Sequence, residues 1–209
     1  MTDHINAKVD ARADLCRFLA ACYYEPTTDF SEEHLFDSMV AAANAIHPDI
    51  AERARKLGAA FVAQDVEALL VDYTALFIGP SQPRAMPYAS FWLTADQSGR
   101  HESTMAVLNL YEQGGFDVSE DFRELPDHVA VELEFLYLLI FAQNQAQLGG
   151  NMADLAAANA LHHRFVVEHL NVWLGAFAAA VKSGTNTAFY RELVELSAIF
   201  VRLEAESSP

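Results

Sequence analysis

The chain has 209 residues, which is long enough for one large domain with a sizeable core or for two small domains. Hydrophobic residues make up 52% of it and charged residues only 20%, which argues against a disordered protein. The formal net charge of −16 argues against a nucleic-acid-binding surface, which needs clustered lysine and arginine, and it suits either a basic partner or simple solubility.

No apolar run follows a basic amino terminus, so we expect no signal peptide. No stretch reaches about 18 continuous apolar residues, so no stable insertion into a membrane is expected either. Cys16 and Cys22 stand six positions apart on different faces of a predicted helix, which is too far for a disulfide. Unpaired thiols that pack as small apolar groups are typical of the reducing cytoplasm, where we place the chain.

Apolar side chains recur at helical spacing, so the amino-terminal half is predicted to be a series of helices. Pro26 ends the first helix, and Gly79 with Pro80 ends the fourth. Ser31 and Asp49 are predicted to cap the second and third helices, because their side-chain oxygens accept hydrogen bonds from the first free N–H groups. The five apolar stripes cover residues 15–22, 35–43, 50–61, 66–77 and 105–111.

The carboxy-terminal half continues this pattern. A helix is predicted from Pro126 to about Leu148. Apolar stripes then run through residues 155–181 with a break near Asn171, and Thr187 is predicted to cap a last helix. The sequence shows neither the alternation of apolar and polar residues that is typical of β-strands nor a repeat of fixed period. We therefore predict a single all-α domain, a helical bundle over the whole chain.

Two irregular segments interrupt the predicted helices. The first, residues 78–99, holds three prolines and several large aromatic residues, which favours a binding role over disorder. The second, residues 114–125, is acidic and begins with two glycines, and we interpret it as a hinge within one domain. Because hinge loops allow two copies to exchange elements, a domain-swapped homodimer is an alternative to a monomer.

The start of the helix at Pro126 combines polar side chains with an apolar continuation. Pro126 suits a first helical turn, where its missing N–H would have no partner. Asp127 is favoured there by the helix macrodipole. His128 and Glu132 are four positions apart, so they are predicted to share one helix face, where Glu132 orients the imidazole. Without further information, a helix cap with an exposed histidine and a solvated Glu124 explains this pattern.

No motif for catalysis or for a cofactor is present. The chain has no phosphate-cradling glycine loop, no nucleophile elbow and no Cys-x-x-Cys pair, so we expect neither an enzyme nor a bound cofactor. His128 and Glu132 have the spacing of metal ligands on a helix. No Glu-x-x-His pair recurs on two helices, however, which leaves a helical metalloprotein as the less favoured alternative.

Three stretches carry a family resemblance. Residues 124–135 read ELPDHVAVELEF, and residues 73–80 read YTALFIGP and are followed by PYASFW at residues 87–92. A weaker match combines Glu168 and His169 with Trp173. Taken together, these stretches make the chain resemble the TorD/DmsD family of redox-enzyme maturation chaperones, over roughly residues 23–203.

The resemblance implies an all-helical cytoplasmic protein that binds the twin-arginine signal peptide, or the apo-form, of a molybdenum-cofactor enzyme until the cofactor is loaded. The arginines of such a peptide would suit the acidic charge of this chain. An assembly factor of the nitrate-reductase type, which binds the body of the enzyme, is the alternative within this resemblance.

The resemblance also gives polar side chains a role in binding. Asp127 is expected to accept hydrogen bonds from an arginine of the peptide, and His128 to hydrogen-bond the peptide backbone and change charge near neutral pH. Aromatic residues at helical spacing are otherwise core residues, above all Phe77. Tyr88 stands where other members of the family carry tryptophan, which affects the shape of the groove. The residues expected to form the peptide site are Tyr23, Tyr73, Leu76, Phe77, Pro87, Tyr88, Trp92, Glu124, Pro126, Asp127, His128 and Glu132.

Overall fold

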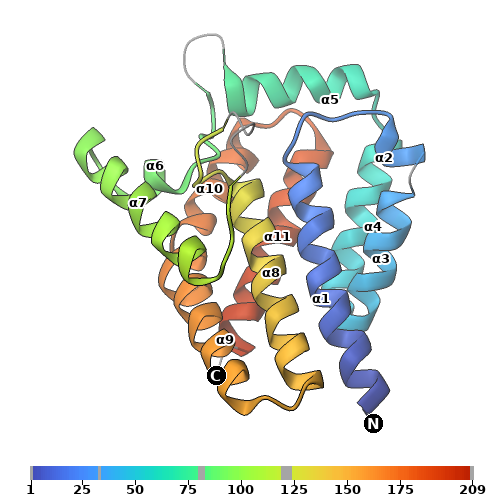
Figure 1. Ribbon diagram of the computed structural model, residues 1–209. Helices are drawn as coiled ribbons and strands as arrows, with labels where there is room; N and C mark the ends of the chain where they lie inside the picture. The colour runs from blue at the N-terminus through green and yellow to red at the C-terminus, as the bar shows by residue number, and fades with distance from the viewer. Residues whose placement is uncertain (1, 33, 80–82, 119–123, 208–209) are drawn as a thin grey trace.

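The computed structural model describes residues 2–32, 34–79, 83–118 and 124–207, and these residues form a bundle of helices (Figure 1). Within these ranges no strand occurs, and an isolated antiparallel bridge joins Tyr88 and His128. The all-α fold is therefore confirmed. The elements are α1 (Thr2–Cys22), α2 (Asp29–Glu32), α3 (Leu35–Ile46), α4 (Pro48–Val62), α5 (Val66–Tyr73), η1 (Thr74–Ile78), α6 (Ala89–Leu93), α7 (Gln97–Gln113), α8 (Val129–Leu148), α9 (Met152–Phe165), η2 (Val166–Leu170), α10 (Asn171–Gly184) and α11 (Ala188–Ser207).

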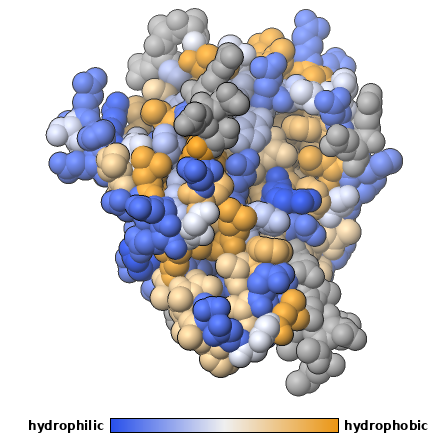
Figure 2. Space-filling view, viewed as in Figure 1, coloured by the Kyte–Doolittle hydropathy of each residue, from blue (hydrophilic) through white to orange (hydrophobic). Residues whose placement is uncertain are grey.

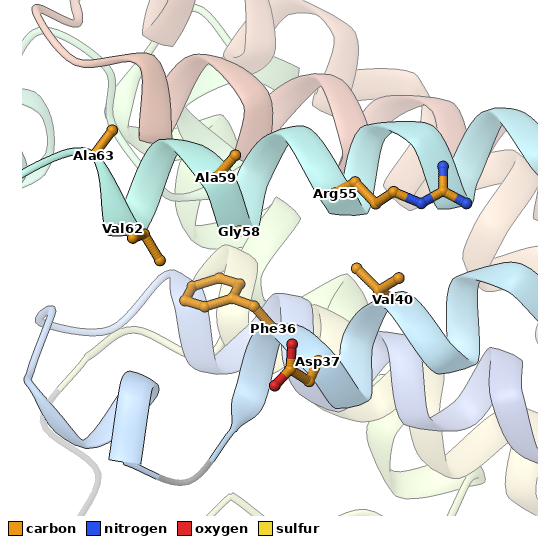
Figure 3. A pocket seen from close by; sticks show the side chains of 8 residues that line it. All are labelled: Phe36, Asp37, Val40, Arg55, Gly58, Ala59, Val62 and Ala63. Atoms are coloured by element: carbon orange, nitrogen blue, oxygen red, sulfur yellow. The ribbon is translucent and has the colours of Figure 1, made fainter.

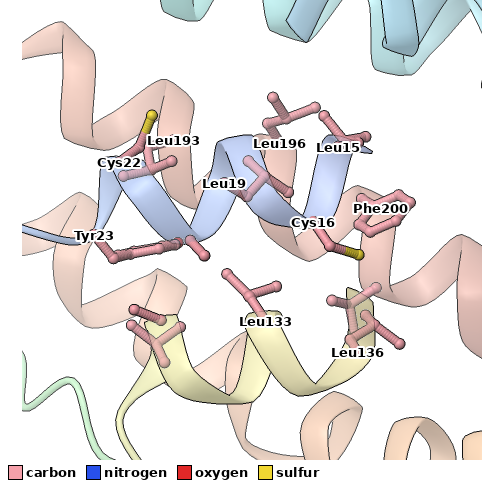
Figure 4. Packing of buried hydrophobic residues seen from close by; sticks show 14 of the residues in the cluster. Leu15, Cys16, Leu19, Cys22, Tyr23, Leu133, Leu136, Leu193, Leu196 and Phe200 are labelled. Carbon is pink, nitrogen blue, oxygen red and sulfur yellow. The ribbon is translucent and has the colours of Figure 1, made fainter. Parts of the chain in front are cut away.

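The core lies where α1, α8 and α11 meet. Helix α1 packs against α3 and α8, and α11 packs against α4 and α10. Figure 4 shows leucines of the three helices pointing toward one another, with Phe200 of α11 among them. Cys16 and Cys22 are buried in this cluster as free thiols, as predicted. Burial raises the pKa of both thiols, so they pack as neutral apolar groups.

Two predicted helix caps are wrong, because Ser31 and Asp49 lie inside helices, and the residue before α3, His34, makes no side-chain capping hydrogen bond. Ser31 lies inside the short helix α2, and α3 begins after His34. Helix α4 is capped by His47, whose Nδ1 accepts a hydrogen bond from the backbone N–H of Asp49 at 3.2 Å. Thr187 does precede α11, but its hydroxyl donates to a carboxylate of α5. Imidazole nitrogen thus replaces the expected carboxylate as a cap acceptor.

Two π-helical turns, η1 and η2, follow directly on α-helices. The turn η1 follows α5 directly, and Gly79 ends it with a φ of 64°. The turn η2 takes the place of the break predicted near Asn171, so that α9, η2 and α10 form one continuous helix from Met152 to Gly184. This helix is long and apolar enough to cross a membrane, but half of its most apolar window is buried in the bundle. Its hydropathy is explained by core packing.

Both irregular segments contain more order than predicted. Residues 78–99 include the short helix α6, and α7 begins at Gln97. In the second segment, Gly114 has no room for a side chain, because an added Cβ would lie 2.6 Å from the ring of Phe135. The hinge assigned to residues 114–125 stays a prediction, since residues 119–123 lie outside the described ranges.

A buried carboxylate fixes α5 across one end of the bundle. Asp72 accepts hydrogen bonds from the hydroxyls of Thr185 and Thr187 at 2.6 and 2.9 Å, and from the backbone N–H groups of Asn186 and Thr187. These residues form the connection between α10 and α11. The contact therefore holds α5 and the following π turn in a fixed position over α10 and α11.

Candidate functional site

A pocket of about 410 Å³ lies where η1, the segment of residues 83–88 and the start of α8 meet. Six of the predicted peptide-site residues line it, and three further residues from the same stretches were missed. The six are Tyr73, Phe77, Pro87, Tyr88, Glu124 and His128, and the three are Ile78, Pro83 and Met86. The three missed residues lie in the proline-rich segment 78–99, which was already predicted to have a binding role. They were not singled out because apolar residues in such a segment are equally typical of ordinary loop packing.

The π turn anchors the wall of this pocket. A π turn leaves carbonyl groups that the ordinary helical pattern would use, and here the carbonyls of Ala75 and Leu76 accept from the backbone N–H groups of Arg84 and Ala85 at 3.3 and 2.8 Å. Further along, the carbonyl of Pro87 accepts from the N–H of Val129 at 2.8 Å. The segment is therefore held on one side by η1 and on the other by the first residue of α8.

His128 caps α8 and forms part of the pocket. Its Nδ1 accepts from the N–H of Ala130 at 3.2 Å, and its ring lies between Tyr24, stacked at 6.3 Å, and Tyr88, at an edge-to-face 5.5 Å. Burial lowers the pKa of His128 to about 4, although the negative charges of Glu124 and Asp127 act in the opposite direction and raise it. The expected change of charge near neutral pH is therefore wrong. The neutral ring carries its proton on Nε2, which makes that nitrogen a donor.

The rim of the pocket is acidic and phenolic. Glu124 accepts a hydrogen bond from the hydroxyl of Tyr88, and Glu134 accepts one from Tyr24 at 2.8 Å. Burial, assisted by the charges of Glu124 and Glu25, raises the pKa of Tyr73 to about 12. Among the described residues, no lysine or arginine forms an ion pair with any of these three glutamates. The rim thus presents negative charge that cations of the described chain do not neutralise.

Asp127 and Pro126 occupy different places from those predicted. Helix α8 begins only at Val129, so neither residue lies in its first turn. Asp127 is fully buried, and its Oδ2 accepts from the N–H of Ser90 at 2.8 Å, near the start of α6. Its Oδ1 has no hydrogen-bond partner among the described residues. Asp127 thus holds the start of α6 in this structure, and its expected contact with a ligand arginine stays a prediction.

Glu132 faces the core and does not orient His128. Its two carboxylate oxygens accept from His169 Nε2 at 2.7 Å and from Trp173 Nε1 at 3.0 Å. Because His128 is the residue before the helix, the two side chains do not share a face as the four-residue spacing suggested. Glu132 is thus in contact with a histidine and a tryptophan that the family resemblance also contained.

Three other predicted site residues support the pocket from behind or lie in the core. Tyr23 is buried, with its hydroxyl 2.9 Å from Ser197 Oγ. Leu76 is buried in the main core. Trp92 is absent from the pocket lining, and its Nε1 donates to the carbonyl of Met86 at 2.8 Å while its ring packs near Phe177. Tyr23 is therefore a core residue, as the alternative for the aromatic residues held, Leu76 also lies in the core, and Trp92 fixes the pocket wall.

A second hollow lies between α3 and α4, away from every predicted site residue (Figure 3). It measures about 580 Å³ and is lined mainly by apolar side chains. Val62 at its edge is 80% exposed.

For a metal, no group of three or more His, Cys, Asp or Glu side chains in the described part of the chain is arranged to hold an ion.

Comparison of the sequence with known proteins shows the family of this chain. The family model for the nitrate reductase delta subunit matches residues 43–179. The chain is 25% identical to the chaperone protein TorD of Vibrio vulnificus strain YJ016, over 99% of this chain and 98% of that protein. It is 31% identical to the chaperone protein TorD of Photobacterium profundum, over 66% of this chain and 62% of that one. A crystal structure of a redox enzyme maturation protein from Archaeoglobus fulgidus is 23% identical over 93% of this chain and 91% of its own, with a TM-score of 0.49.

Proposed function

Because the chain belongs to the nitrate reductase delta subunit family and, within it, to the TorD/DmsD type of maturation chaperones, we propose that it binds the twin-arginine signal peptide of a molybdenum-cofactor oxidoreductase before export. A maturation chaperone for a molybdoenzyme needs to recognise that enzyme or its leader. The proposal adds which part is recognised and where on this chain it binds.

The pocket beside His128 is the observation that carries the proposal. It combines an apolar wall, formed by Phe77, Ile78 and Pro87, with Glu124, which forms no ion pair with a lysine or arginine of the described chain. A twin-arginine leader has the complementary order, with arginines before an apolar stretch. Guanidinium groups form strong hydrogen bonds with carboxylates, and apolar side chains gain free energy on burial. One pocket therefore offers both halves of the recognition.

The proposed mechanism is reversible binding without a chemical step. The chaperone holds the leader in the cytoplasm, which delays export and shields an apolar segment from proteases. It keeps the attached enzyme in its apo-form until the cofactor is inserted. In this proposal Glu124 binds an arginine, the neutral His128 donates a hydrogen bond to the peptide, and Asp127 keeps α6 in place.

Calorimetric titration with synthetic leaders of the host's own molybdoenzymes tests the proposal. One leader is expected to bind, and replacement of its two arginines by alanine should weaken binding about tenfold to a hundredfold, since the charge-assisted hydrogen bond of one arginine to Glu124 contributes about 1.5–3 kcal/mol. Affinity should also fall as salt screens the acidic rim. Failure of every leader to bind would contradict the proposal.

Glu124→Gln isolates the charge at the rim. The amide oxygen still accepts from Tyr88, so the fold should keep its melting temperature, whereas leader affinity should fall about tenfold because the carboxylate is lost. The dependence of affinity on salt should also become weaker. Glu67→Gln, on exposed α5 surface, is the matched control and should leave affinity unchanged. Equal affinities of the two variants would remove Glu124 from the site.

The name of the matching family model favours a second candidate, in which the chain binds the body of the enzyme as an assembly factor of the nitrate-reductase type. The two candidates differ in what they need from the partner. Full affinity for an apo-enzyme that lacks its leader would favour the second, and loss of binding with the leader would favour the first.

A further inference from the structure

The outer face of α8 carries apolar side chains below the pocket. Phe141 follows Tyr137 by four positions and Leu138 by three, so it adjoins both on this face, and Phe141 is 44% exposed. The rings of Tyr137 and Phe141 stack at 6.1 Å. Residues 135–148 contain no charged side chain, although much of this face is not buried. Figure 2 shows hydrophobic residues on the front of the molecule, where Figure 1 places α8 between α7 and α1.

This apolar face is continuous with the pocket. Tyr24 stacks on His128, which lines the pocket, and the hydroxyl of Tyr24 donates to Glu134. Glu134 lies one helical turn before Tyr137 on α8. Phe141 follows His128 by thirteen positions, which corresponds to about 20 Å along a helix.

We propose that this face of α8 binds the distal part of the leader's apolar stretch in helical form, with the arginines at the pocket end. The inference rests on the proposed function. The pocket of about 410 Å³ has the size of a site for a drug-sized group. An apolar stretch of about 7–15 residues is longer, and as a helix it spans about 10–22 Å. The remaining residues need an apolar surface that leads away from the pocket.

Charge determines the direction of the bound segment. Glu25, Glu124 and Glu134, which form no ion pair with a lysine or arginine of the described chain, lie at the pocket end, whereas residues 135–148 of α8 include no charged residue. Arg17 lies over the ring of Tyr137 at 5.8 Å, with Asp14 at 3.9 Å from its guanidinium. A basic segment is therefore attracted to the upper end, and an apolar segment fits the lower end.

The groove between α3 and α4 is the competing apolar surface (Figure 3). Its lining includes one acidic and one basic residue, Asp37 and Arg55, so it has no preference for a basic partner. It is also separate from the residues that line the pocket beside His128. Val62 of this groove therefore supplies a matched control for Phe141, since both are exposed apolar side chains.

The test is a double-mutant cycle measured by calorimetry. The two proteins are the unaltered chain and Phe141→Ser, and the two probes are the synthetic leader that binds the unaltered chain and the same leader with the distal half of its apolar stretch changed to serine. Phe141→Ser should weaken binding of the first leader about five- to tenfold, as expected for losing a partly exposed phenylalanine. It should leave binding of the serine-substituted leader unchanged, because the contact is already missing.

Three results would overturn the inference. Equal effects of Phe141→Ser on both leaders would show that Phe141 does not contact the distal half. If Phe141→Ser leaves the affinity for the first leader unchanged, the face of α8 is not part of the site. If only Val62→Ser weakens binding of that leader, the apolar stretch binds in the groove between α3 and α4. If no leader binds the unaltered chain, the proposed function itself fails. Melting temperatures of both variants should match the unaltered chain, since both side chains are exposed.

Discussion

Replacing Glu132 by alanine is expected to lower the free energy of unfolding by about 3–5 kcal/mol, the usual cost of removing one partner from a buried charged pair. Its carboxylate is fully buried and bonded to both His169 and Trp173. Burial raises the pKa of Glu132. Burial also lowers that of His169, but the charge and hydrogen bond of Glu132 outweigh this effect and raise it. The variant leaves two buried N–H groups without a partner, and urea unfolding measures the loss.

Glu195→Ala provides the comparison for this prediction. Glu195 lies on α11 and forms an exposed ion pair with Lys182 at 2.7 Å. Such surface pairs contribute about 0–1 kcal/mol, so this variant should unfold at nearly the same urea concentration as the unaltered chain. A loss below about 1 kcal/mol for Glu132→Ala would mean that the buried contact adds little to stability and that water or a rearranged side chain replaces it.

The helices could be predicted from the sequence because apolar spacing follows the geometry of a single helix. Their exact starts could not. Ser31 and Asp49 have the side chains that most often cap helices, but His34 and His47 stand at those positions. Which of several nearby acceptors caps a helix depends on where the preceding chain enters, and that is decided by packing with distant segments.

The candidate site was predictable to the extent that its residues are close in sequence. Tyr73 with Phe77, and Pro87 with Tyr88, come from two short motifs that the fold brings to one pocket. The place of Glu132 was not predictable from its spacing to His128, because the helix starts at Val129, three residues later than predicted, and leaves His128 outside it. Its real partners are 37 and 41 positions away, on η2 and α10. Contacts over such separations depend on tertiary packing, which spacing along one helix does not describe.

Acid is expected to destabilise this fold through His128. The pKa of its ring is about 4 in the folded chain, lowered by burial, against about 6.5 when the chain is unfolded. Between these values the unfolded chain binds more protons, so stability falls as the pH falls through 6.5 toward 4. The gap between the two pKa values corresponds to about 3 kcal/mol. Urea unfolding at pH 7 and pH 4 measures this loss, and a proton NMR titration of the ring measures the pKa itself.

His128→Asn separates this titration from the role of the side chain as a cap. Asparagine is a favoured N-cap, so its oxygen can accept from the N–H of Ala130 as Nδ1 does, but it has no proton to gain in this range. The negative charges of Glu124 and Asp127 act on this position in both proteins. The buried pairs of Glu132 with His169 and of Glu204 with Arg12 are also common to both, so these effects largely cancel in the comparison. The variant should therefore lose about 3 kcal/mol less than the unaltered chain between pH 7 and pH 4. Parallel losses would show that His128 is protonated in the folded chain as readily as in the unfolded one, which its burial between Tyr24 and Tyr88 opposes.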